Sequence, residues 1–293
     1  MYASLMTDLI DVRVSPEQAA TLAHRHGFVG LDLRLNDDDA PQTAAQAEPI
    51  RRRMDELGLR AGYCSILPGK FSADADEWSR HRVRLEARCA VAQALGFTRT
   101  CAVVLPFHPT LAFDDAMDLH RTRLDDVLPV LAQHGIALGL EYVSPITRRA
   151  DQPNEFIHDL AGMLDLIERA GRPEHLGLLL DTFHWHCAGE SEHDLAALPA
   201  SRVVGVHLND AIADRPTERQ RVDERELPGA TGVIDLAGFM RGLRRAGYAG
   251  PISSEPSHPR WKTVDPDDAC AQTGRAVRDA IALAAPGSGS DAA

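Results

Sequence analysis

Cysteine is scarce in this chain and follows no pattern. The five cysteines form no CxxC pair and are odd in number, which argues against a disulfide framework and against a thiolate zinc site. Cys64, Cys89 and Cys101 lie in apolar runs and are predicted to be small core residues. Cys187 has no neighbour that would stabilise a thiolate, so we expect it to be inert.

The chain also has fewer basic than acidic residues and lacks long apolar segments. The 31 Lys and Arg residues face 43 Asp and Glu residues, a net charge of −12 that opposes broad contact with nucleic acid or an anionic membrane. No apolar stretch approaches the roughly 18 residues of a membrane-spanning helix, and no basic segment with a cleavage site follows Met1. We therefore expect a cytoplasmic protein with no nucleic-acid or membrane partner.

What the sequence does contain is a repeating unit in which a helical pattern stops at a glycine and an apolar run follows. Glycine tolerates the left-handed backbone that closes a last helical turn. Successive spacings between these glycines are 31, 38, 39, 36 and 76 residues, for Gly27, Gly58, Gly96, Gly135, Gly171 and Gly247. The last spacing is twice 38, and the apolar run 203–207 fills the gap. With the run after Met1, this pattern predicts eight strands.

The helical segments between these runs carry their own signals. Ser15, Pro16 and Glu17 provide an N-cap, a first-turn proline and a carboxylate that suits the helix dipole. Near-continuous Val, Leu and Ile runs are typical of parallel strands that are covered on both faces. The sequence therefore predicts an α/β fold, a (β/α)₈ TIM barrel over residues 1–285, followed by a disordered tail at 286–293.

Four of the last five predicted strands end in a side chain that can bind a metal ion. These residues are Glu141, Asp181, His207 and Glu255, and in this fold strand ends meet at one face of the barrel. A single acid there most often caps the next helix, and a single histidine is usually structural. Three converging carboxylates, however, would repel one another unless a cation shared them. The pattern thus predicts one bound divalent ion.

Three carboxylates and one imidazole form a mainly oxygen donor set, which suits Mn²⁺, Mg²⁺ or Co²⁺. An ion that chelates a carbonyl and its neighbouring hydroxyl makes the adjacent C–H acidic. Glu141 and Glu255 would then be the catalytic pair, one removing a proton and the other returning it.

The motifs LGLEYVSP, GLLLDTFHWH, VVGVHLND, ELPGATGVIDL and ISSEP resemble the xylose isomerase-like TIM barrel superfamily, in particular the sugar phosphate isomerase/epimerase family. The resemblance implies that Glu141, Asp181, His207 and Glu255 are the metal ligands and that the two glutamates move protons. It also implies that His184 contacts substrate oxygens, with orientation of Asp181 as the alternative role. A homodimer or homotetramer is implied as well.

Three further residues are candidates for substrate binding. Trp185 would either stack on a sugar ring or pack in the barrel mouth, and His108 follows the fourth strand. Arg225 lies in the long loop 210–226, which also carries three other arginines. The loop is either a lid over the substrate or, as its mixed charges favour, a solvated segment.

Two positions depart from the pattern of the ketose 3-epimerases that the chain resembles. Ala213 stands where those enzymes place a substrate arginine, and Thr147 stands where they place a glutamate. These differences argue against a ketose 3-epimerase in particular and leave the predicted metal chemistry unchanged.

The leading hypothesis is a metal-dependent isomerase or epimerase that acts on a sugar, keto-sugar or cyclitol through an enediolate. A lyase or dehydratase acting on a keto-sugar, keto-glycoside or dehydroshikimate-like substrate begins with the same proton abstraction and is the alternative. An abasic-site endonuclease would need additional histidines, of which His108 is a candidate, and the acidic balance opposes DNA binding. A non-catalytic barrel subunit remains the last alternative.

Overall fold

Eight parallel strands close into a barrel in the computed structural model, which describes residues 1–284. Around the barrel their order is β1, β10, β9, β8, β6, β4, β3 and β2. Their bounds are β1 (Tyr2–Leu5), β2 (Gly30–Arg34), β3 (Arg60–Ser65), β4 (Arg99–Val104), β6 (Ala137–Tyr142), β8 (Leu176–Asp181), β9 (Val203–Leu208) and β10 (Pro251–Ser254). The predicted (β/α)₈ TIM barrel is confirmed. The tail predicted at 286–293 lies outside the described residues.

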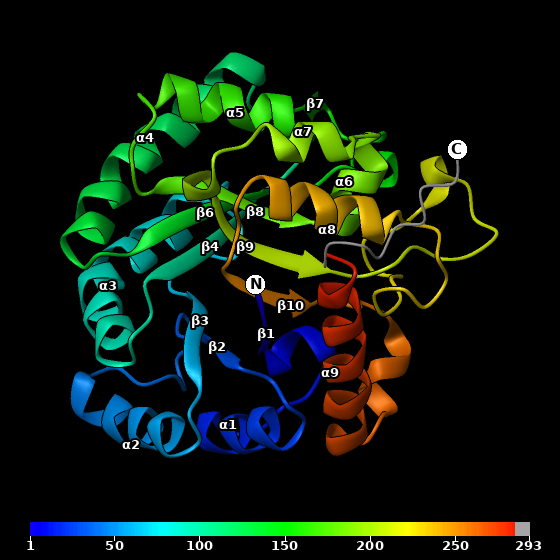
Figure 1. Ribbon diagram of the computed structural model, residues 1–293. Helices are drawn as coiled ribbons and strands as arrows, with labels where there is room; N and C mark the ends of the chain where they lie inside the picture. Colours follow the sequence, from blue (N-terminus) through cyan, green and yellow to red (C-terminus); the bar gives the residue numbers. More distant parts are fainter. Residues whose placement is uncertain (285–293) are drawn as a thin grey trace.

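Helices form an outer ring around these strands (Figure 1). They are α1 (Pro16–Arg25), α2 (Ala44–Glu56), α3 (Ala75–Ala94), α4 (Phe113–Gln133), α5 (Leu160–Arg169), α7 (Glu192–Ala196), α8 (Leu236–Arg245) and α9 (Pro266–Ala282). Within residues 1–284, no helix combines the length and the apolar character needed to cross a bilayer.

The predicted helix boundaries have the expected chemistry. Ser15 caps α1 through a capping box with Gln18, and Pro16 occupies the first turn. All six glycines of the repeat have positive φ values, between 64° and 84°, the left-handed backbone that favours glycine. Local signals therefore set both where the helices begin and where they end.

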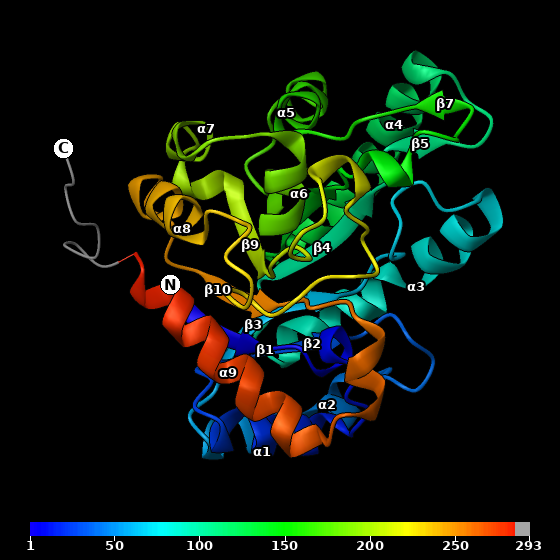
Figure 2. The same ribbon diagram turned by 90° about the vertical axis from the view of Figure 1, so that its right-hand side faces the viewer.

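Some elements were not anticipated. Helix α6 (Thr182–Ala188) begins directly after β8, with Asp181 as its N-cap. A short antiparallel pair, β5 (Phe107–His108) with β7 (Asn154–Glu155), lies outside the barrel. Figure 2 looks onto the end of the barrel toward which the strand arrows of β9 and β10 point in Figure 1, and the yellow segment after β9 lies across it.

A carboxyl group is buried inside the barrel at Asp32 of β2. Its oxygens accept hydrogen bonds from the hydroxyls of Ser4 and Ser253 and from the backbone N–H of Tyr63. A Cβ atom at Gly62 would clash with Asp32 Oδ1, so the close approach of β3 to this carboxyl requires glycine there. Burial raises the pKa of Asp32, although these hydrogen bonds oppose the shift.

Candidate metal centre

Four neighbouring strands bring the four predicted metal ligands together. Glu141 lies in β6, Asp181 ends β8, His207 lies in β9, and Glu255 directly follows β10. Each offers one ligand atom, and these atoms all lie within 4.8 Å of one another. Glu141, Asp181 and His207 are buried, whereas the Glu255 side chain is 20% exposed and faces the opening.

The residues of this cluster fit a divalent ion. Oε1 of Glu141 is buried and accepts no hydrogen bond, although it lies 3.5 Å from Nδ1 of His207. A buried carboxylate oxygen in that position needs an electropositive partner. Three carboxylates and one imidazole supply the oxygen-rich donor set that Mg²⁺ and Mn²⁺ prefer. These four residues are therefore the ones that would hold the ion.

His207 sits between the two glutamates. Its Nδ1 lies 3.1 Å from Oε2 of Glu255, and its Nε2 lies 2.7 Å from the hydroxyl of Tyr63. Burial alone would lower the pKa of His207, but the carboxylates of Glu255 and Glu141 raise it to about 10. The imidazole thus carries a proton on Nδ1 at neutral pH, and a bound metal ion would take that proton's place.

Both carboxylate oxygens of Asp181 accept hydrogen bonds. Its Oδ1 accepts hydrogen bonds from the backbone N–H groups of Phe183 and His184, at 2.7 and 3.1 Å, because the residue caps α6. Its Oδ2 accepts hydrogen bonds from the side chains of Asn209 at 2.8 Å and Arg225 at 3.3 Å. Donors on both oxygens fix the orientation of this side chain.

Arg225 is part of the cluster and not of a solvated loop. Its side chain is 4% exposed, and Nη2 lies 3.1 Å from Oε1 of Glu255 and 2.7 Å from Oγ of Ser257. Burial alone would raise the pKa of Glu255, but Arg225 and His207 lower it well below its ordinary value. The prediction of a solvated loop was wrong for this residue, because two carboxylates draw the guanidinium inward.

Comparison with known proteins supports the same fold. A family model described as xylose isomerase-like TIM barrel matches residues 20–283. A solved xylose isomerase domain protein from Alicyclobacillus acidocaldarius is 28% identical, with a TM-score of 0.85, and the match covers 97% of this chain and 99% of that one.

The chain belongs to the xylose isomerase-like TIM barrel family. Among its relatives, the inosose isomerase of Halalkalibacterium halodurans is 25% identical over 146 residues, which is 50% of this chain and 48% of that protein. The 3-dehydroshikimate dehydratase of Pseudomonas aeruginosa is 38% identical over 248 residues, 82% of this chain and 36% of that protein. The chain spans about half the length of the first relative and about a third of the second.

His184 is the predicted substrate residue that this xylose isomerase-like barrel keeps beside the metal centre. The residue is buried, and its Nδ1 accepts a long hydrogen bond of 3.4 Å from the backbone N–H of Ser144. Only its backbone N–H, and not its ring, bonds to Asp181. The alternative role, in which the ring orients Asp181, is therefore not what the structure has.

Trp185 and His108 lie elsewhere. The indole of Trp185 is buried, packs edge-on against Phe239 of α8 and donates to the backbone oxygen of Ser191. Of the two predicted roles, stacking on a sugar and packing, these contacts favour packing. Nδ1 of His108 accepts hydrogen bonds from the backbone N–H groups of Thr110 and Leu111. Within the described residues, 1–284, neither belongs to the group of candidate metal ligands. His108 therefore does not supply the additional histidine that the endonuclease alternative would need.

The loop that carries Arg225 is fixed over the barrel end. The buried side chain of Gln220 bonds to the backbone of Ile212 and Arg215, and Thr147 donates to the backbone oxygen of Gln220 at 2.7 Å. Ala213 is exposed on this loop. In place of the glutamate of ketose 3-epimerases, Thr147 thus ties the loop to the segment after β6.

A polar cavity of about 470 Å³ opens beside Glu255. Its lining is polar and includes the acidic residues Asp8, Asp11 and Asp223, the basic residues Arg34 and Lys262, and His258. Side chains of this kind donate and accept hydrogen bonds, which suits a polyhydroxylated ligand.

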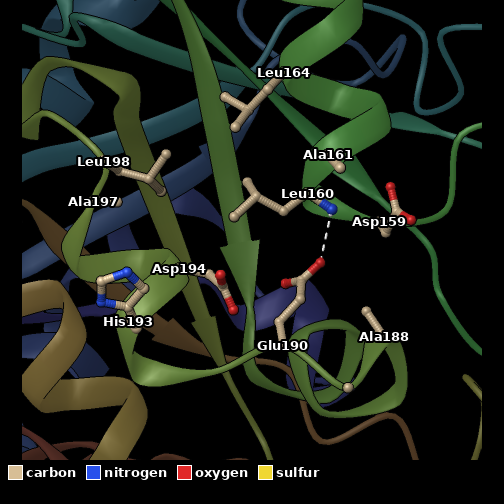
Figure 3. A pocket seen from close by; sticks show the side chains of 11 residues that line it. Asp159, Leu160, Ala161, Leu164, Ala188, Glu190, His193, Asp194, Ala197 and Leu198 are labelled. Atoms are coloured by element: carbon tan, nitrogen blue, oxygen red, sulfur yellow. Dashed lines mark hydrogen bonds between the residues drawn. The ribbon is translucent and has the colours of Figure 1, made fainter.

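A second cavity, of about 450 Å³, lies away from the metal centre, between α5 and α7 (Figure 3). Its carboxylates already serve the fold. Asp159 caps α5, Asp194 bonds to Ser191 at the start of α7, and Glu190 accepts hydrogen bonds from the backbone of Leu160 and from the hydroxyl of Tyr142. These three carboxylates are therefore already engaged in hydrogen bonds that support the fold.

Tyr63, Ser257 and the inward position of Arg225 were missed by the sequence interpretation. Tyr63 lies inside the apolar run of the third strand. Because a buried hydroxyl needs a hydrogen-bond partner, its presence in a buried strand could have indicated a polar contact inside the barrel. No spacing rule connects β3 to β9, because the two strands are far apart in the chain and meet across the barrel interior.

Proposed function

We propose that this chain is a divalent-metal-dependent isomerase or epimerase of a sugar, keto-sugar or cyclitol. The observation that carries the proposal is the cluster of Glu141, Asp181, His207 and Glu255, whose ligand atoms lie within 4.8 Å of one another beside a polar cavity. Relatives in the family include an inosose isomerase, which supports a cyclitol or sugar as the substrate class.

Each residue of the cluster has a distinct part in this reaction. A divalent ion, when bound, polarises a carbonyl and makes the neighbouring C–H acidic. Asp181 and His207 would hold the ion, and their hydrogen-bond partners fix the two side chains in place. Glu141, buried beside the other three residues of the cluster, would take the proton. Glu255, which faces the cavity, would deliver a proton taken up from solvent to the opposite face, or move a hydroxyl proton. His184 and Arg225 orient the substrate oxygens.

Hydrogen exchange with solvent tests this proposal directly. The protein is freed of metal with a chelator and then incubated in D₂O with Mn²⁺, Mg²⁺ or Co²⁺ and with a panel of inososes and ketohexoses. We expect NMR to show metal-dependent incorporation of deuterium beside the carbonyl of at least one compound, together with an isomer whose mass differs from that of the substrate only by the incorporated deuterium. A panel that shows no exchange with any of the three ions would contradict the proposal.

A lyase is the second candidate, and one observation favours it. The 38% identity over 82% of this chain is to a 3-dehydroshikimate dehydratase, and this reaction also begins with removal of a proton beside a carbonyl. The test is incubation with 3-dehydroshikimate and the same ions. Loss of water to give an aromatic product, detected by ultraviolet absorbance and mass spectrometry, would assign the chain to the lyases.

A further inference from the structure

We propose that Tyr63 is a positioning residue that fixes the tautomer of His207, so that Nδ1 of the imidazole presents its lone pair to a divalent ion. The inference rests on the metal centre proposed above and adds a residue from the other side of the barrel. Tyr63 belongs to β3, which lies four strands away from β9 in the barrel order. The contact between the two residues therefore crosses the barrel interior.

The contact is short and shielded from solvent. The hydroxyl oxygen of Tyr63 lies 2.7 Å from Nε2 of His207, and the two residues are 3% and 4% exposed. Their rings are tilted by 46° with centroids 5.6 Å apart. Because water has little access to either group, the partner that each finds in the protein determines where its proton lies.

A third atom allows the hydroxyl of Tyr63 to act as the acceptor. The hydroxyl oxygen of Tyr63 also lies 3.1 Å from Sδ of Met6, and a thioether sulfur can only accept. A hydroxyl has one proton, so with that proton directed at Met6 the oxygen accepts from Nε2–H of His207. A neutral imidazole with its proton on Nε2 carries its lone pair on Nδ1, the nitrogen that faces Glu255 and Glu141.

The tyrosine is itself held in place from inside the barrel. Its backbone N–H donates to Oδ1 of Asp32 at 2.9 Å, and the same oxygen accepts the hydroxyl of Ser4 at 2.7 Å. Gly62 allows this approach, because a side chain there would meet Asp32. Tyr63 is therefore an anchored acceptor, the role that carboxylates and backbone oxygens play beside other metal-binding histidines.

Measuring metal affinity, without any substrate, tests the inference. The dissociation constant of Mn²⁺ is obtained from the electron paramagnetic resonance signal of the free ion, for the wild type and for Tyr63→Phe. We expect the variant to bind Mn²⁺ about 10- to 100-fold more weakly, the loss typical when the partner of a metal-binding histidine is removed. Tyr248→Phe is the matched control, because its buried hydroxyl donates to the backbone of Pro251 and touches no predicted ligand. This control should keep the wild-type affinity.

Met6→Leu provides an independent arm that keeps the tyrosine. Leucine has nearly the volume of methionine but offers no acceptor, so the Tyr63 proton turns toward Nε2 and favours the tautomer whose proton blocks Nδ1. We expect a severalfold loss of Mn²⁺ affinity. This arm decides the matter if Tyr63→Phe does not fold, since a purely structural tyrosine would leave affinity unchanged here.

The possible outcomes are distinguishable. If the wild type binds none of Mn²⁺, Mg²⁺ and Co²⁺, the proposed metal centre itself is wrong. If the wild type binds Mn²⁺ and both Tyr63→Phe and Met6→Leu bind it equally tightly, the positioning role of Tyr63 is overturned while the proposed function stands.

Discussion

At the scale of single residues, the two glutamates of the cluster differ in how their oxygens are engaged. Glu255 is paired with Arg225 through one oxygen and with His207 through the other. Glu141 has a buried oxygen that accepts no hydrogen bond. Under the proposed function, Glu141 removes the substrate proton and Glu255 delivers one.

Glu141→Gln tests this difference. Glutamine keeps the shape of the side chain but cannot take a proton, so deuterium exchange on an active substrate should fall by about 10²- to 10⁴-fold, the usual contribution of a general base. The exchange rate is measured by NMR in D₂O at saturating metal. Glu192→Gln, on the outer helix α7, serves as the control and should exchange at the wild-type rate. If Glu141→Gln exchanged deuterium as fast as Glu192→Gln, Glu141 would not be the base that removes the proton.

Loss of Arg225 should destabilise the fold, because its guanidinium forms two buried ion pairs. Arg225→Met retains much of the apolar stem but leaves the carboxylates of Asp181 and Glu255 without their buried counter-charge. We expect the free energy of unfolding of the metal-free protein to fall by about 3–5 kcal/mol, as when one partner of a buried ion pair is removed. Urea denaturation measures it.

The control for this variant lies four residues earlier in the same loop. Arg221 pairs with Asp223 at the surface and its side chain is 53% exposed, so Arg221→Met should change the free energy of unfolding by less than about 1 kcal/mol. If Arg225→Met proved as stable as Arg221→Met, the buried ion pairs would not stabilise the protein.

At the scale of elements, the connection after β9 behaves as a fixed cover. The side chain of Asp210 accepts hydrogen bonds from the backbone N–H groups of Thr231, Gly232 and Ile234. The backbone of Asp210 also forms two hydrogen bonds with the backbone of Glu226. Gln220 fastens the middle of the loop with side-chain hydrogen bonds to its backbone. The buried position of Arg225 follows from this arrangement, because both ends of the loop are tied down.

Gln220→Ala should loosen this cover without unfolding the barrel. The substitution removes hydrogen bonds to the backbone of Ile212 and Arg215, each worth about 1 kcal/mol. Amide hydrogen exchange in residues 211–226 should therefore become faster, while exchange in the barrel strands stays as in the wild type. Gln42→Ala, in an exposed loop, is the control. An unchanged exchange pattern in 211–226 would show that Gln220 does not hold the loop.

At the scale of the whole molecule, the sequence predicted what repeats and what is local. The six glycine-to-strand units, with the run after Met1 and the run 203–207, predicted all eight barrel strands, and the strand-end rule placed Glu141 and Glu255 in one cluster. The direction of Trp185 and the inward turn of Arg225 were not predictable, because they depend on which neighbours the closed barrel supplies. The contact of Tyr63 with His207 likewise exists only once strands distant in sequence face each other.

The pH dependence of global stability should show the effect of one buried acid, Glu190. Burial raises its pKa to about 7 from an ordinary 4.5. Between these values the folded chain keeps a proton that the unfolded chain has lost, so this residue's contribution to the free energy of unfolding falls as pH rises from about 4.5 to 7 and is constant above that range. The difference corresponds to roughly 3 kcal/mol.

Glu190→Gln isolates this contribution from those of all other acids, because glutamine cannot ionise and still accepts a hydrogen bond from Tyr142 or Leu160. Urea denaturation of the wild type and the variant is compared at pH 5 and pH 7.5. The variant should gain stability relative to the wild type between the two values, since only the wild type must hold a buried carboxylate at pH 7.5. A stability difference that stays constant with pH would show that Glu190 ionises in the folded protein as readily as in the unfolded one.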